Sequence, residues 1–138
     1  MVVTDVWGRA QIRSLQGSEY FVTFTDLHSR FSAVYFLKST KEVRDCYKKF
    51  EALVKTQTGR TIRRVRSDNG KEYLNKEMKD YAESQGTLFE QTAPHSSAQN
   101  GVAEHLNRTL MDYARAMLFQ HTLLKFLWQE VVAHSTYV

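Results

Sequence analysis

Two aspartates stand where β-like segments could bring their carboxylates to the same place. Asp5 interrupts the apolar run VVTDVWG, where a charged group is costly to bury unless it is satisfied or functional. Asp68 ends the run TIRRVRSD and is followed at once by Asn-Gly, a turn pair. Ligands of α/β sheets usually bind at the carboxyl ends of strands. If the two strands lie parallel and adjacent, the carboxylates repel each other, and a bound divalent cation would relieve that repulsion.

A third carboxylate, Glu104, lies on a segment with helical periodicity at 99–119. The apolar positions of this helix form one stripe, made of Ala103, Leu106, Leu110, Tyr113, Ala114 and Met117. Glu104 falls off that stripe, as do Arg108 and Arg115, so one helix face presents a carboxylate and two guanidiniums. Three carboxylates suit Mg²⁺ or Mn²⁺, and arginines suit phosphates. The alternative is a surface glutamate paired with the arginine four residues further on.

Two other acids compete for the same roles. Asp26 ends a strand that runs antiparallel to the Asp5 strand, so it is expected at the opposite edge, where the turn TDLHSR explains it. Glu72 follows Asp68 by four residues and lies in the same turn, which suits a supporting position.

The elements that must position these acids follow from periodicity and turn signals. Strands are predicted at 2–8, 20–26, 31–37, 61–67 and 87–91. Helices are predicted at 40–57, 75–85, 99–119 and 124–137, with a loop at 92–98. Ser39 and Glu42 match a capping box before the first helix, and Gly59 ends that helix.

This element order predicts an α/β fold with a mixed five-stranded sheet. The first three strands form an antiparallel meander, and the later strands are reached through helices, which favours parallel pairing. The sheet therefore has three antiparallel and two parallel strands and is flanked by helices on both faces. At 138 residues the chain is long enough for one domain.

The composition of the chain excludes several other classes of protein. No apolar run reaches the 18 or so residues of a membrane span, and no signal-peptide pattern opens the chain. Cys46 is the only cysteine, which excludes an internal disulfide and a zinc module that needs two cysteines. The net charge is +4, and residues 38–66 carry ten lysines and arginines against three acids. This imbalance suits a polyanionic partner, although from charge alone a solvated helix face is the more common explanation.

Four segments in order resemble the integrase catalytic core of copia-type LTR retrotransposons, in the retroviral integrase superfamily. They are TDVWG at 4–8, YFVTFTDLHSRF at 20–31, RSDNGKEY at 66–73 and TAPHSSAQNGVAEHLNRTL at 92–110. Asp68 and Glu104 are separated by 35 residues, which is similar to the family's spacing. Each motif alone is weak, but the four together are specific and cover almost the whole chain.

The resemblance implies an RNase H-like fold and a two-metal polynucleotidyl transferase. Asp5, Asp68 and Glu104 match the family's catalytic, metal-binding acids, which hold two Mg²⁺ or Mn²⁺ ions when DNA is bound. The implied reaction trims the 3′ ends of element DNA and then joins them to target DNA by phosphoryl transfer. The candidate contacts to double-stranded DNA are Gln99, Asn100, Asn107, Arg108 and Arg115.

Further expectations follow from the same resemblance. Residues 1–138 form a single catalytic core, without the family's N-terminal zinc-binding and C-terminal DNA-binding regions. A homodimer is expected through the first long helix and the C-terminal helices. Part of the apolar stretch formed by Leu123, Leu124, Phe126, Leu127, Trp128, Val131 and Val132 should pack against the second subunit. A nuclear location, with a cytoplasmic particle stage, is implied, and no membrane association.

Some positions depart from the family pattern and keep other functions open. Lys71 replaces a usual glycine, His105 and Leu106 replace a usual basic pair, and Arg9 and Leu124 stand where proline is common. The alternatives are a domesticated or decayed core that binds DNA or protein without catalysis, an RNase H-like nuclease without strand transfer, and an unrelated α/β domain.

Overall fold

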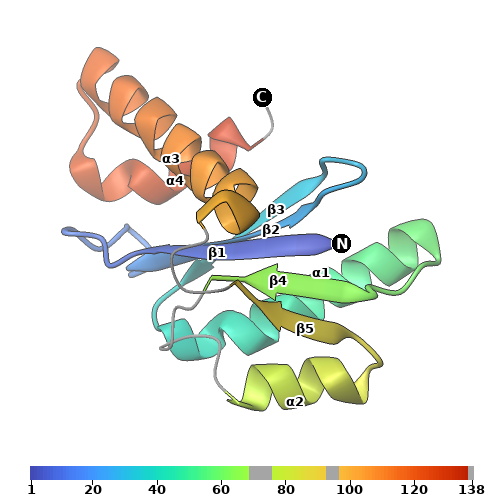
Figure 1. Ribbon diagram of the computed structural model, residues 1–138. Helices are drawn as coiled ribbons and strands as arrows, with labels where there is room; N and C mark the ends of the chain where they lie inside the picture. Colours follow the sequence, from blue (N-terminus) through green and yellow to red (C-terminus); the bar gives the residue numbers. More distant parts are fainter. Residues whose placement is uncertain (69–75, 93–96, 137–138) are drawn as a thin grey trace.

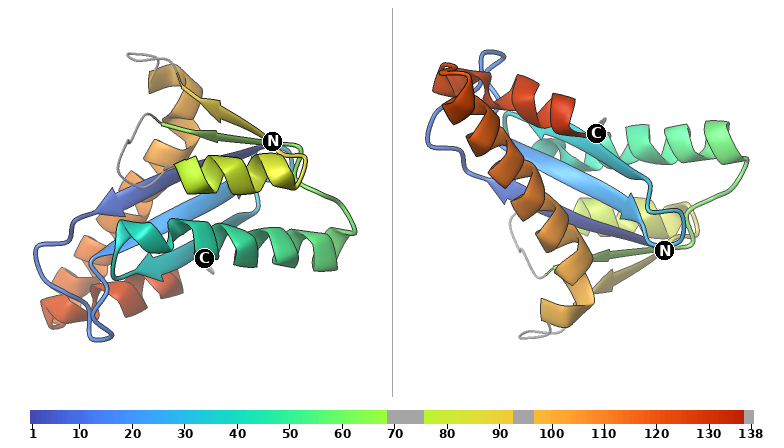
Figure 2. Two further views of the ribbon diagram at one scale, coloured as in Figure 1. Left: turned by 90° about the horizontal axis from the view of Figure 1, so that it is seen from below. Right: turned by 90° about the horizontal axis from the view of Figure 1, so that it is seen from above.

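The computed structural model describes residues 1–68, 76–92 and 97–136, without the side chains of 97–99. A central sheet lies between two pairs of helices (Figure 1). Helices α1 and α2 cover one face, while α3 and α4 cover the other, as the two further views also show (Figure 2). No helix in these ranges is long and apolar enough to cross a membrane.

The sheet has five strands in the order β3-β2-β1-β4-β5. They are β1 (Val2–Gly8), β2 (Tyr20–Asp26), β3 (Ser32–Leu37), β4 (Arg64–Ser67) and β5 (Leu88–Gln91). The first three strands pair antiparallel, and β4 pairs parallel with both β1 and β5. The predicted mixed sheet is confirmed, and the parallel β1–β4 pair places the middle of β1, which carries Asp5, beside the end of β4, which Asp68 follows.

The first helix begins more gradually than the sequence predicts. A 3-10 turn, Thr40–Glu42, leads into α1 (Val43–Thr58). The Ser39 hydroxyl accepts from the Lys41 amide at 3.3 Å, and the Glu42 carboxylate accepts from the Lys38 amide at 3.0 Å. This arrangement resembles a capping box with its contacts moved by one residue. Gly59 ends α1 in the left-handed conformation (φ 66°), which glycine adopts without a steric penalty.

The remaining helices are α2 (Lys76–Ser84), α3 (Ser97–Gln120) and α4 (Trp128–Ser135). Helix α3 begins inside the predicted 92–98 loop, so it carries an extra half turn before Glu104. A short 3-10 turn, Lys125–Leu127, precedes α4, which divides the helix predicted at 124–137. Strand β4 starts three residues later than predicted, because only its last four residues pair with β1 and β5.

Each face of the sheet has its own hydrophobic core. On the α1–α2 side, Phe24 stacks on Phe50 with ring centroids 5.1 Å apart, and both rings are fully buried. On the α3–α4 side, Phe21 and Trp128 pack with Leu110, Ala114 and other α3 residues. Trp7 stacks on Phe21 at 5.2 Å and joins β1 to this second core. The second core therefore holds α3, the helix that carries Glu104, against β1, the strand that carries Asp5.

The most basic segment lies mainly away from the candidate acids. Helix α1 covers the opposite face of the sheet from α3. Arg44 of α1 pairs with Glu77 at 2.9 Å, and the Lys48 ammonium lies 4.7 Å from the centre of the Tyr81 ring. At the other end of the segment, Arg66 pairs with Glu90 at 3.0 Å. Several lysines and arginines of residues 38–66 therefore form contacts within the fold, and others lie on a solvated helix face.

Candidate active site

Asp5, Asp68 and Glu104 are brought together from three elements. Asp5 lies in β1 on the side that faces α3, Asp68 directly follows β4, and Glu104 lies in the second turn of α3. Asp5 and Asp68 are half-buried, while the Glu104 side chain is exposed. The parallel β1–β4 pairing, with Thr4 opposite Ser67, sets the first two acids next to each other at one end of the sheet.

The pKa of Asp5 reflects the proximity of the three acids. The pKa of Asp5 is raised from 3.8 to about 6, first because burial penalises the charged carboxylate. The negative charges of Asp68 and Glu104 raise the pKa further, while a hydrogen bond from Asn107 opposes the shift. The three carboxylates therefore lie in one region of the protein. This surrounding makes the charged form of Asp5 less favourable than it is in water.

Asn107 holds the Asp5 carboxylate directly. Its side-chain Nδ2 donates to Asp5 Oδ2 at 2.8 Å, and its Oδ1 accepts from the hydroxyl of Thr23 at 2.9 Å. Thr23 lies opposite Asp5 in the β1–β2 pair and is fully buried. Sequence reasoning missed Thr23, although the register of the predicted hairpin is the signal that would place it beside Asp5.

A second asparagine of α3 also contacts β1. Asn100 is 1% exposed, and its Nδ2 donates to the Thr4 backbone carbonyl at 3.4 Å. Asn100, Ala103 and Asn107 are all buried, whereas Glu104 is exposed, so α3 rests on β1 with Glu104 on its solvent side. Both asparagine side chains are buried and bond to β1, and their expected contact with DNA stays a prediction.

The other expected DNA contacts are placed differently. Arg108 and Arg115 are exposed on α3, and Arg115 donates to Asp112 at 3.3 Å. Gln99 lies in α3, but its side chain is outside the described part of the structure. Among the residues that the structure describes, Glu104 forms no ion pair with Arg108, so the simple surface-pair reading of Glu104 is not what the structure shows.

Asp26, one of the two competing acids, lies away from the site. Asp26 lies opposite Val2, at the far end of β1, and accepts from the amide and hydroxyl of Ser29 at 3.0 and 2.8 Å. The predicted turn role of Asp26 is therefore confirmed. Glu72 and Lys71 fall outside the described residues.

The three carboxylates fit a divalent cation by their chemistry. They offer oxygen ligands only, which Mg²⁺ and Mn²⁺ prefer, and their charges already disfavour each other. Across residues 1–68, 76–92 and 97–136, however, no three His, Cys, Asp or Glu side chains are gathered tightly enough to hold a metal ion. The acids thus lie within electrostatic range without forming a closed ligand set.

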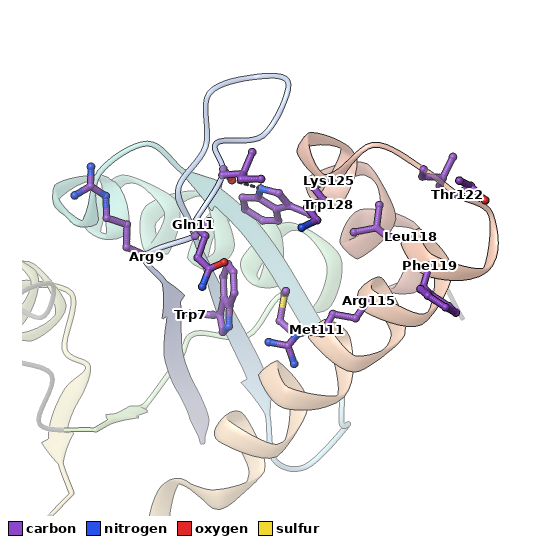
Figure 3. A pocket seen from close by; sticks show the side chains of 13 residues that line it. Trp7, Arg9, Gln11, Met111, Arg115, Leu118, Phe119, Thr122, Lys125 and Trp128 are labelled. Atoms are coloured by element: carbon purple, nitrogen blue, oxygen red, sulfur yellow. Dashed lines mark hydrogen bonds between the residues drawn. The ribbon is translucent and has the colours of Figure 1, made fainter.

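A pocket of about 910 Å³ lies along the same face of the sheet (Figure 3). It opens between the segment that follows β1 and the second half of α3, and Trp7, Met111, Arg115 and Trp128 are among its lining residues. Trp7 is two residues beyond Asp5 on β1, so the pocket is close to the acids in the fold. None of the three acids lines it, and the pocket is distinct from the carboxylate cluster.

The strand order, the helices on both faces and the two acids on neighbouring parallel strands define the class of RNase H-like folds. The chain belongs to the integrase core domain family, because the model of that family matches residues 1–97. The matched range includes Asp5 and Asp68 and ends before Glu104.

Two curated relatives are similar over nearly all of this chain. The retrovirus-related Pol polyprotein from transposon TNT 1-94 of Nicotiana tabacum is 44% identical over 138 residues. The transposon Ty1-DR6 Gag-Pol polyprotein of Saccharomyces cerevisiae is 32% identical over 137 residues. The chain covers 10% and 8% of these two proteins, so it corresponds to a small part of each.

A solved structure shows the same fold. A chain of the simian T-cell lymphotropic virus intasome, in complex with PP2A regulatory subunit B56 gamma, superposes with a TM-score of 0.73. The superposition covers 99% of this chain and 46% of that chain, at 14% sequence identity. The predicted RNase H-like fold is thereby confirmed.

Proposed function

We propose that this chain is the catalytic core of a polynucleotidyl transferase that processes the 3′ ends of retroelement DNA and joins them to target DNA. Asp5, Asp68 and Glu104 are the catalytic acids, and they hold Mg²⁺ or Mn²⁺ when DNA is bound. Membership of the integrase core family and similarity to retrotransposon polyproteins support this reaction class.

One observation carries the assignment of the three acids. The charges of both Asp68 and Glu104 act on Asp5, although the three residues come from different elements and are far apart in the chain. A fold gains nothing in stability from gathering like charges, because each carboxylate disfavours the ionised state of the others. Such a cluster is typical of a site that binds a cation.

Each acid has a distinct part in the proposed mechanism. Asp5 and Asp68 extend from the rigid sheet and provide fixed oxygen ligands, while Glu104 approaches from the exposed side of α3. Metal ions held by these three acids would supply Lewis-acid chemistry, activating the attacking oxygen and stabilising the leaving oxygen of the phosphodiester. The half-buried position of Asp5 shields its carboxylate from competing water, and the Asn107 amide keeps the carboxylate in one orientation.

The exposed arginines of α3 are the proposed contacts to DNA phosphates. Arg108 follows Glu104 by one helical turn, and Arg115 lies two turns further along the exposed side. A guanidinium binds phosphate oxygens through two parallel hydrogen bonds. Gln99 remains a candidate contact near the start of the same helix.

The test is Mn²⁺-dependent reversal of strand transfer on a branched DNA oligonucleotide. Wild-type protein should resolve the branch, and Glu104→Gln should abolish the reaction, because the amide removes a charged ligand while preserving shape. The control is Glu83→Gln, which changes an exposed glutamate on α2, on the opposite face of the sheet.

Three outcomes separate the candidate functions. Branch resolution that requires Glu104 supports the transferase. Cleavage without strand joining would point to a nuclease instead. No reaction and no Mn²⁺ binding by calorimetry would contradict catalysis and favour a core that binds DNA or protein. We further propose that the protein acts on double-stranded DNA in the nucleus, after a cytoplasmic particle stage.

A further inference from the structure

A chain of two hydrogen bonds runs beneath the candidate site and ends on Asp5. The Thr23 hydroxyl of β2 donates to Asn107 Oδ1 at 2.9 Å, and Asn107 Nδ2 donates to Asp5 Oδ2 at 2.8 Å. Thr23 is 0% exposed and Asn107 is 3% exposed, so water does not compete for these contacts. The chain links three elements, because Asp5 lies in β1, Thr23 in β2 and Asn107 in α3.

The direction of this chain follows from what each group can donate. An ionised carboxylate only accepts hydrogen bonds, so the Asn107 amide must turn its NH₂ group toward Asp5. The amide oxygen then faces Thr23, whose hydroxyl has one proton to donate. Among the described residues, the other acceptor within reach of that proton is the Asp5 backbone carbonyl, at the longer distance of 3.4 Å. The Asp5 carboxylate and the Thr23 hydroxyl therefore favour the same orientation of the Asn107 amide, and the two bonds together hold it.

Loss of the Thr23 hydroxyl would leave Asn107 Oδ1 buried without its donor and would remove one of the two bonds that hold the amide. The amide would then be anchored by Asp5 alone, so the Asp5 carboxylate would lose a firmly held donor and its fixed orientation in the site. Thr23 lies directly opposite Asp5 in the strand register, so its hydroxyl acts on Asn107 and Asp5 from a strand that is paired with β1. The Thr23 hydroxyl bonds to Asn107 Oδ1 at 2.9 Å and to the Asp5 backbone carbonyl at 3.4 Å, so its effect on the Asp5 carboxylate passes through Asn107.

We infer that Thr23 is a positioning residue of the active site: its hydroxyl helps to fix the orientation of the Asn107 amide, which holds Asp5 ready to bind metal. This inference rests on the proposed function, in which Asp5 is a metal ligand. Partners that orient metal ligands typically change metal affinity or activity by about 10–100-fold when they are removed.

The experiment compares three variants of the whole chain. Thr23→Val removes the hydroxyl with little change in shape, and Thr23→Ser retains the hydroxyl. Thr25→Val is the matched control, because Thr25 is also buried on β2 and its hydroxyl bonds to Ser32 at 2.9 Å, outside this chain of contacts. Urea unfolding of each variant measures the general cost of losing a buried hydroxyl.

The first readout is the Mn²⁺ concentration that gives half-maximal binding by calorimetry and half-maximal branch resolution. Thr23→Val should require about tenfold more Mn²⁺, whereas Thr23→Ser and Thr25→Val should stay within about twofold of wild type. Equal Mn²⁺ requirements for Thr23→Val and Thr25→Val would overturn the inference, because both variants would then show only a general loss of stability.

The second readout needs neither metal nor catalysis. The side-chain amide protons of Asn107 can be followed by NMR in metal-free protein. Thr23→Val should shift these resonances and speed their exchange with water, and Thr23→Ser should restore both. Unchanged Asn107 resonances in Thr23→Val would overturn the inference even if wild-type protein bound no metal. Absence of Mn²⁺ binding by wild type, together with the expected NMR change, would instead contradict only the proposed function.

Discussion

At the scale of single residues, Asp5 is destabilised in its charged form by burial and neighbouring acids, and this penalty is partly compensated by a hydrogen bond. Asp5 loses solvation on burial and faces two other acids, and among the described residues the Asn107 amide is its side-chain hydrogen-bond donor. Such an arrangement is poor for stability and useful for binding a cation. The proposed chemistry therefore depends on a residue whose charged form the fold penalises.

This penalty predicts a pH-dependent effect of Asp5→Asn in protein kept free of metal with EDTA. The folded chain holds the Asp5 proton more tightly than the unfolded chain, because the pKa rises from 3.8 to about 6. The contribution of Asp5 to stability is thus full below pH 3.8 and is lost as pH rises through 6. Asp5→Asn should raise the free energy of unfolding by about 1 kcal/mol more at pH 8 than at pH 5.

Urea unfolding at the two pH values measures this difference. The new carbonyl can still accept from Asn107, so the hydrogen bond is retained. The control is Asp112→Asn, an exposed change on α3 that should affect both pH values equally. A stabilisation by Asp5→Asn that is the same at pH 5 and pH 8 would contradict the raised pKa.

At the scale of elements, the seating of α3 on β1 decides where Glu104 stands. Asn100 and Asn107 bond to β1 on either side of Glu104, and Ala103 between them is fully buried. Small and amide side chains let the helix approach the strand closely. The exposed acid is therefore positioned by its buried neighbours.

We expect Ala103→Leu to separate α3 from the sheet. Overpacking a filled interior costs about 1–3 kcal/mol, and the displaced helix would carry Glu104 away from Asp5. Thermal unfolding should show the loss of stability, and branch resolution should fall by more than tenfold at a temperature where the variant is folded. Val102→Leu, at a position that is 41% exposed, should leave both measurements near wild type. Full activity in folded Ala103→Leu would show that the site tolerates a shift of α3.

At the scale of the whole molecule, most of the apolar C-terminal stretch is used within the chain. Trp128, Val131 and Val132 are buried in the second core, whereas Leu123 and Leu124 are 38% and 61% exposed. Phe119, at 90% exposed, lies nearby among the pocket-lining residues. What remains for a second subunit on this side is therefore the segment before α4 and the end of α3.

The homodimer, expected through α1 and the C-terminal helices, stays a prediction. Sedimentation velocity at micromolar concentration should give the mass of two chains. Leu124→Glu should shift the protein toward monomer, because it places a charge at the most exposed leucine of this stretch. Leu88→Glu is the control, because Leu88 is an exposed leucine on β5, at 51% against 61% for Leu124. Monomer alone for wild type would contradict the dimer.

Sequence alone determined the element order and the mixed sheet and singled out the three candidate acids, because hydrophobic periodicity and turn residues act locally. The same information did not show which way the asparagines of α3 face, since an amide in a helix can face either solvent or protein. Only the tertiary structure decided that Asn100 and Asn107 bond to β1 and that Thr23 supports Asp5. These roles depend on strand register and helix seating, which are contacts between residues up to 102 positions apart.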